Sequence, residues 1–256
     1  MNLKHKSVGI LAGLGCLVAS SVALAQAQAE ANVGMALPGA APPAAAAGGA
    51  SDHDQVVGRL AVGYLGRRTM QVGAAPQPGG IFTAELAAPV VGIRYWIDQM
   101  LGIDAGLGLF VTSGSFEQDN PAPPDLDGDL PSATVFILHA GVPLSLASAD
   151  HFSFQIVPEV NVGIGSGSEL DGDVSHNGFQ LDAGARAGAE IQFGFMGIPQ
   201  LSLQGSIGAL FAIRSLKTDN DVTDVTNTEN STVVTTTVGD NPWNIFTSNV
   251  AALYYF

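Results

Sequence analysis

Apolar and polar residues alternate with a period of two over most of the chain beyond Asp54. The segment 152–164 shows the pattern most clearly, because its even-numbered residues are all apolar and its odd-numbered residues are mostly polar or glycine. Residues 179–195 repeat the pattern. Successive side chains of a strand point to opposite faces, whereas a helix does not sustain a two-residue period over a dozen residues. This alternation predicts an all-β fold.

The pattern recurs in segments that we expect to form eight antiparallel strands: 56–66, 82–97, 101–112, 133–146, 152–164, 179–195, 201–214 and 244–256. The connections are of two kinds. Short ones fall at 98–100, 148–150 and 197–199, and long polar ones fall near 67–80, 113–131, 166–177 and 215–242. An even number of strands, with short turns at one end and long loops at the other, is typical of a transmembrane β-barrel.

Composition favours lipid rather than water outside this sheet. Charged residues make up 12% of the chain, about half the usual share in soluble domains. The polar face of the predicted strands carries no lysine. A lipocalin-like soluble barrel also alternates, but a continuous apolar belt of this size would aggregate in water. A closed sheet also satisfies every backbone group, as lipid requires. We therefore expect an eight-stranded antiparallel transmembrane β-barrel.

The first 25 residues have the features of a secretory signal peptide. Lys4 and Lys6 precede an apolar run, and Ala23-Leu24-Ala25 forms a small-residue cleavage site. A helical membrane anchor is the alternative, but glycines interrupt the run. No later segment holds 18 unbroken apolar residues, so no transmembrane helix is expected.

Residues 26–55 are rich in alanine, proline and glycine and have no period. We expect them to form a disordered spacer, with the barrel occupying 56–256. The formal charge of −14 argues against a nucleic-acid partner, because phosphate binding needs a basic surface. Cys16 is the one cysteine of the sequence, which excludes a disulfide framework.

Taken together, the signal peptide, the alternating segments and the ending resemble the small, porin-like outer-membrane β-barrels of the OmpA/OmpX type. The ending places Val250, Ala252, Tyr254 and Phe256 at alternate positions. The resemblance implies the outer membrane of a Gram-negative bacterium, lipid contact and periplasmic termini. It also implies that the barrel-assembly machinery reads the last strand. No peptidoglycan-binding domain follows these segments, so wall tethering is not expected.

An eight-stranded barrel has an interior just wide enough for side chains to fill. Charged residues predicted to face that interior are Arg59, Arg94, Asp104, His139, Glu159, Asp182, Arg186 and Glu190. Counting residues from the predicted turns places Arg94 opposite Asp104 and His139 opposite Glu159. Unpaired charges in a narrow lumen are costly, so we expect ion pairs that plug it. The alternative is a narrow channel for small solutes, with the same residues at its constriction.

Enzymatic function is not expected. A hydrolase acting on lipid needs a nucleophile with a base in hydrogen-bond reach, yet no histidine falls on the predicted lipid-facing side. His139 points inward, His53 and His151 are predicted near the periplasmic rim, and Ser175-His176 in a long loop. No catalytic, cofactor-binding or metal site is predicted, and no cofactor.

Two acidic segments, 125–129 and 169–173, share the sequence Leu-Asp-Gly-Asp. Closely spaced carboxylates suit Ca²⁺, but neither segment completes an EF-hand, so solvated turns are favoured. The sequon 230–232 is expected to be coincidental. The predicted role is therefore non-enzymatic and structural or surface-presenting, through long acidic loops.

Overall fold

The computed structural model describes residues 50–77, 80–118, 126–169, 173–238, 243–247 and 249–256. The predicted signal peptide at 1–25 and most of the predicted spacer lie outside these residues. In chain order, the elements are α2 (Asp52–Val56), β1 (Leu60–Gln77), β2 (Gly80–Trp96), β3 (Gly102–Gln118), β4 (Leu126–Gly141), β5 (Leu144–Ala149), β6 (Phe152–Ser168), β7 (Val174–Phe193), the 3-10 turn η2 (Gly194–Met196), β8 (Ile198–Asn220), β9 (Val225–Thr236), α3 (Asn244–Thr247) and β10 (Val250–Tyr255). Neither described α-helix is long and apolar enough to cross a membrane.

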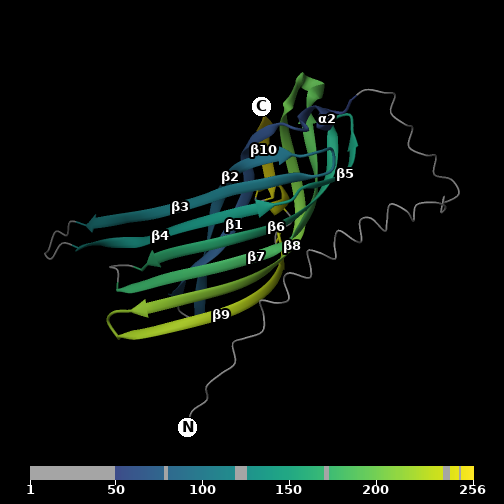
Figure 1. The fold of residues 1–256 in the computed structure, drawn as a ribbon. Coiled ribbons are helices and arrows are strands. Elements are labelled where there is room, and N and C mark those ends of the chain that lie inside the picture. Colours follow the sequence, from purple (N-terminus) through teal and green to yellow (C-terminus); the bar gives the residue numbers. More distant parts are fainter. Residues whose placement is uncertain (1–49, 78–79, 119–125, 170–172, 239–242, 248) are drawn as a thin grey trace, which may run out of the picture. The chain divides into compact units, whose positions relative to one another are not determined.

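The strands form one antiparallel sheet that closes on itself (Figure 1). β10 pairs with β1 on one side and with β8 on the other, so a ring of eight strands runs β10-β1-β2-β3-β4-β6-β7-β8. β5 pairs with the first part of β6, and β9 pairs with the second half of β8. The prediction of an all-β antiparallel fold is confirmed.

The two ends of the ring differ. At the turn end, short connections join β2 to β3, β5 to β6 and β7 to β8. At the hairpin end, the strand pairs continue almost to the connecting residues, which forms four long hairpins: β1–β2, β3–β4, β6–β7 and β8–β9. Residues predicted as long loops are therefore largely strand. On β9, side chains are exposed on both faces, which explains why its sequence shows no apolar alternation.

The polar face of the strands is buried and the apolar face is exposed. On β6, Phe152, Phe154, Val160 and Ile164 are exposed, while the odd-numbered residues from Ser153 to Gly163 are all buried. On β3, Leu107 is 55% exposed, whereas Asp104, three residues earlier on the opposite face of the same strand, is 3% exposed. The ring therefore has a polar interior and an apolar outer surface, as the alternation predicts.

Helix α2 lies at the turn end and is bonded to all three short connections. Asp52 donates its backbone N–H to the Asp150 carbonyl and accepts from the Gly194 N–H. His53 contacts the Gln99 carbonyl at 2.9 Å and packs edge-on against Trp96. A capping box at Ser51 begins the helix. The predicted disordered spacer thus includes, at its last residues, an ordered helix.

Only the first residues of strand β1, at the turn end, form part of the wall of the ring. It pairs with β10 only from Ala61 to Tyr64, and no ladder joins it to β9 among the described residues. Bulges lie at Gly66 and Gly73, whose φ angles of 103° and 126° suit glycine. Beyond the first bulge, β1 crosses the interior toward β6 and β7.

Glycines on β6 and β7 make room for this crossing. A Cβ atom at Gly165 would lie 2.6 Å from Val72 Cγ2, and one at Gly178 would lie 2.6 Å from the Gln71 carbonyl. Met70 and Val72 are buried there and belong to the main apolar cluster. The hairpin half of the interior is consequently filled by β1 itself.

Candidate functional site

A fully buried ion cluster occupies the turn end of the interior. Arg94 on β2 faces Asp104 on β3, with Nε 2.7 Å from Oδ1 and Nη2 2.8 Å from Oδ2. Arg94 Nη1 also donates to Glu190 Oε2 on β7, at 3.0 Å. None of these side chains is exposed. The bidentate pair is the strong arrangement of an arginine and a carboxylate, and the predicted opposition of Arg94 and Asp104 is confirmed.

Polar side chains from other strands complete this turn-end cluster. Gln204 Oε1 accepts from Arg94 Nη2 at 2.9 Å, and Gln155 donates to Glu190. Tyr255 donates its hydroxyl to Glu190 Oε1 at 3.0 Å and accepts from Trp96 Nε1 at 3.1 Å. The cluster thereby links β2, β3, β6, β7, β8 and β10, which are six of the eight strands of the ring.

Removing the Tyr255 hydroxyl should destabilise the ring. In Tyr255→Phe, Glu190 loses a donor and the buried Trp96 Nε1 loses its acceptor. The expected loss is about 1–3 kcal/mol, measured by urea unfolding of protein in micelles. Tyr254→Phe is the matched control, since that ring lies on the outer surface against Phe256. Equal effects of the two substitutions would contradict the assigned role of the hydroxyl.

A second cluster lies deeper along the interior, toward the hairpin end. Glu159 on β6 accepts from Arg186 Nε on β7 at 2.6 Å and from Arg68 Nη2 on β1 at 2.9 Å. Arg186 Nη1 donates to Ser206 Oγ at 3.0 Å. Arg68 Nε donates to Asn161 Oδ1 at 3.2 Å. One carboxylate thus holds two guanidinium groups, and the middle of the interior is closed by charge-assisted hydrogen bonds.

The predicted opposition of His139 and Glu159 is wrong. His139 lies opposite Asn161 and contacts its Oδ1 at 2.7 Å, while Glu159 lies opposite Gly141. The prediction placed the turn centre at Ala149. The β5–β6 turn instead falls at Asp150 and His151, and a register shift between Ser145 and Ala147 moves the pairing again.

Arg59 is also misplaced by the sequence prediction. It is exposed and precedes β1, and its backbone N–H donates to the Val56 carbonyl at the end of α2. The alternation predicts an inward side chain only where a strand exists, and here the helix ends instead. Asp182 is buried as predicted, but its carboxylate accepts from Gln180 Nε2 rather than from a cation.

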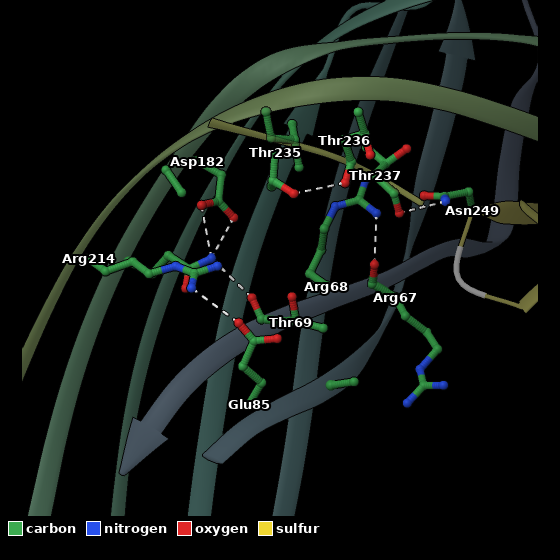
Figure 2. Close-up of a pocket in the computed structure, with 14 residues that line it drawn as sticks. Arg67, Arg68, Thr69, Glu85, Asp182, Arg214, Thr235, Thr236, Thr237 and Asn249 are labelled. Atoms are coloured by element: carbon green, nitrogen blue, oxygen red, sulfur yellow. Dashed lines mark hydrogen bonds and ion pairs between the residues drawn. The ribbon is translucent and has the colours of Figure 1, made fainter. Parts of the chain in front are cut away.

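A cavity of about 250 Å³ lies at the hairpin end, between the outward face of β1–β2 and the inner face of β7–β9 (Figure 2). Across it, Arg214 Nη1 on β8 donates to Glu85 Oε1 on β2 at 3.1 Å. Gln180 Nε2 donates to the Thr69 carbonyl at 3.0 Å. Its lining residues are Arg67, Arg68, Thr69, Glu85, Ala87, Gln180, Asp182, Leu210, Ala212, Arg214, Thr235, Thr236, Thr237 and Asn249.

Sequence reasoning missed several of these residues. Arg68 falls in the predicted loop 67–80, and the bulge at Gly66 reverses which β1 residues point inward. Glu85 falls in the predicted strand 82–97, on the face opposite to that of Arg94. Tyr255 and Trp96 lie at inward positions of their strands and could have been found from the alternation. The cavity could not, since it depends on β1 leaving the wall.

The histidines in the described part of the chain do not gather into a catalytic group. Ser175 and His176 lie on β7, not in a loop, and as strand neighbours they point to opposite faces. His176 is buried and contacts Thr218 Oγ1 and Glu169 Oε1. His151 Nδ1 lies 2.7 Å from Asp52 Oδ2 at the turn end.

Residues 126–129 of the first acidic segment lie on β4 and pair with β3, so they form strand and not the predicted solvated turn. Position 125 and residues 170–172 of the second acidic segment lie outside the described residues. Within the residues that are described, no three histidine, cysteine, aspartate or glutamate side chains gather as a metal site. The sequon 230–232 lies on β9, with its side chains at the surface. No protein-family model and no curated protein matches this chain.

Proposed function

We propose that this chain is an outer-membrane β-barrel protein, closed to solutes, with a structural or surface-presenting role. The observation that carries the proposal is the inverted distribution of polarity. Large apolar side chains cover the outside of the ring, and arginine, aspartate and glutamate fill the inside. An apolar exterior of this extent suits a hydrocarbon solvent and would aggregate in water.

The height of the apolar surface fits a bilayer. Along β6, outward-facing apolar residues run from Phe152 to Ile164. At about 3.3 Å per residue this stretch is roughly 40 Å long. With a strand tilt of about 40°, it would rise roughly 30 Å, close to the thickness of a hydrocarbon core.

Exposed aromatic side chains lie near both edges of this surface. At the turn end these are Tyr95, Phe152, Phe195, Tyr254 and Phe256. Toward the hairpin end, Phe136 on β4 and Phe179 on β7 lie in one row, on either side of Ile164 on β6. Two aromatic girdles are characteristic of outer-membrane barrels. Between these edges, no outward-facing residue on the described strands is charged.

The surface-presenting role rests on the hairpin end. The β8–β9 hairpin continues well beyond the row at Phe179 and is rich in threonine, asparagine and aspartate. Residues on both faces of β9 are exposed over most of its length. This hairpin would project from the bilayer, while the two interior clusters keep the barrel closed.

Planar-bilayer recordings test the closed state. The purified chain should insert without producing discrete conductance steps, because the turn-end and middle clusters fill the interior. Insertion itself would be verified by heat-modifiable mobility of the same vesicle preparation. Reproducible openings from correctly inserted protein would contradict the closed barrel and favour a narrow solute channel.

A further inference from the structure

The wall of the ring is interrupted in its hairpin half. The ladder between β2 and β3 ends at Val90 and Gly108, whereas β3 continues to Gln118 and pairs there with β4 only. Among the described residues, β9 likewise pairs with β8 only. The inward course of the β1–β2 hairpin therefore leaves the edges of β3 and β9 without a strand between them.

Arg67 is an exposed arginine at this interruption. It is the first residue of β1 to pair again after the bulge at Gly66, and it lies opposite Pro89. Figure 2 shows its side chain directed away from the other labelled side chains around the cavity. No carboxylate of the described residues lies within ion-pair distance of Arg67, whereas Arg68 and Arg214 are both paired. Arg67 is thus the cation at the cavity that is left without an anion.

A tyrosine hydroxyl lies near Arg67. Tyr64 is half-buried on the outward face of β1, and the charges of Arg67 and Arg68 both act on its hydroxyl. In the described part of the chain, this hydroxyl has no hydrogen-bond partner. An arginine fork and a hydroxyl donor together suit the oxygens of a phosphate.

The charge balance of this region also favours an anion. Four of the nine lysines and arginines of the chain gather at the cavity and the middle cluster: Arg67, Arg68, Arg186 and Arg214. They meet three carboxylates, those of Glu85, Glu159 and Asp182. The local excess of positive charge contrasts with the formal charge of −14 of the whole chain.

The register places Arg67 at the hairpin-end edge of the apolar outer surface. Its partner Pro89 adjoins Val90, which pairs with Gly108. The next residue of β3, Leu109, pairs with Phe136 of the aromatic row. In a bilayer, this is the depth at which headgroups meet hydrocarbon. An ionisable residue on a lipid-facing surface is rare and takes a partner, and lipid phosphates are the anions at that depth.

We propose that Arg67 and Tyr64 bind the phosphate of an anionic membrane lipid. The guanidinium would donate to two phosphate oxygens and the Tyr64 hydroxyl to a third. The acyl chains would lie over the exposed side chains of Val62, Val91 and Ile93, which continue from Arg67 toward the middle of the apolar surface. The inference rests on the proposed function, because it requires this surface to contact a bilayer.

Quenching of tryptophan fluorescence by brominated lipids tests the proposal. Val91→Trp places a reporter opposite Tyr64. Leu138→Trp places a control reporter in the same row of the sheet, two strands away, because Leu107 pairs with both Val91 and Leu138. Both reporters are made in a Trp243→Phe background, and Trp96 is buried. The full chain is refolded into dioleoylphosphatidylcholine vesicles that contain brominated phosphatidic acid or brominated phosphatidylcholine.

At position 91, phosphatidic acid should be enriched over phosphatidylcholine by about fivefold. No such enrichment is expected at position 138. Arg67→Gln should abolish the enrichment at 91, and Tyr64→Phe should reduce it by about twofold or more. Arg59→Gln is the matched control, because Arg59 is also exposed but lies at the turn end, and it should change nothing. Heat-modifiable mobility verifies folding of each variant.

Equal enrichment at 91 and 138 would overturn the proposal, and so would enrichment at 91 that survives Arg67→Gln. Loss of the enrichment when inorganic phosphate is added would show a site for free phosphate and overturn the assignment to a lipid. Quenching at both positions without a preference for either lipid would overturn this inference alone. If brominated phosphatidylcholine quenches neither reporter, the outer surface does not contact lipid, and the proposed function fails together with the inference.

Discussion

Replacing Arg94 with alanine should destabilise the folded chain by about 3–5 kcal/mol. The substitution leaves Asp104 and Glu190 buried with no cation, and these carboxylates have no exposed surface through which water could solvate them. Urea unfolding in micelles, followed by tryptophan fluorescence, measures the loss. Trp96 is a suitable reporter, because the Arg94 guanidinium lies 5.9 Å from its ring centroid.

The control for Arg94 is an exposed ion pair of the same chain. Lys217 lies 2.7 Å from Asp219 on the β8–β9 hairpin and is half exposed. Lys217→Ala should change stability by less than about 1 kcal/mol.

A double-mutant cycle of Arg94→Gln and Asp104→Asn should give a coupling of about 1–3 kcal/mol. Coupling within error of zero would remove this pair from the account of the interior.

Leu107→Arg should destabilise the chain in a bilayer by about 2–4 kcal/mol. Leu107 lies on the outward face of β3, between the aromatic residues at the two edges. An arginine there would face hydrocarbon if the ring spans a membrane. The same substitution at a water-exposed position would change stability by no more than about 0.5 kcal/mol. Unfolding in phospholipid vesicles measures the difference.

Ser113→Arg provides the matched comparison on the same strand. Ser113 is exposed and lies beyond Val111, toward the hairpin end. The cost of an arginine falls to about 0–1 kcal/mol near the membrane interface. Similar small effects at positions 107 and 113 would argue that both side chains face water.

The inward and outward faces could be predicted from sequence because a period of two leaves no ambiguity within an unbroken strand. The Arg94–Asp104 pair could be predicted for a related reason. The pairing of β2 with β3 contains no bulge, so counting from the short connection gives the correct partner.

Register could not be predicted where the backbone departs from regular pairing. The β5–β6 turn at Asp150 and His151 moves the partner of His139 three positions beyond Glu159, and the shift between Ser145 and Ala147 moves it back by one, to Asn161. The bulge at Gly66 changes which β1 residues face inward and brings Arg68 to Glu159. Long-range placement of β1 across the interior decides both the middle cluster and the cavity.

Residues at the edges of strands were misassigned for a different reason. Arg59 continues the alternation of β1 in sequence, but α2 and its C-cap replace the strand there. On β9, the polar sequence predicts a loop because side chains on both faces of this strand are exposed. Periodicity reports burial rather than backbone hydrogen bonding, so strands that leave the apolar belt are invisible to it.

Contact between lipid and the outward face of the ring is the basis of the proposed function. Nitroxide spin labels at cysteines replacing Leu107, Leu109 and Ile207, in a Cys16→Ser background, test it in phospholipid vesicles. Relaxation by oxygen, which concentrates in hydrocarbon, would be compared with relaxation by a water-soluble nickel chelate. A label at Thr228 on the exposed β9 gives the aqueous reference. Labels at 107, 109 and 207 should show strong oxygen access and little nickel access. Nickel access at these positions equal to that at 228 would contradict it.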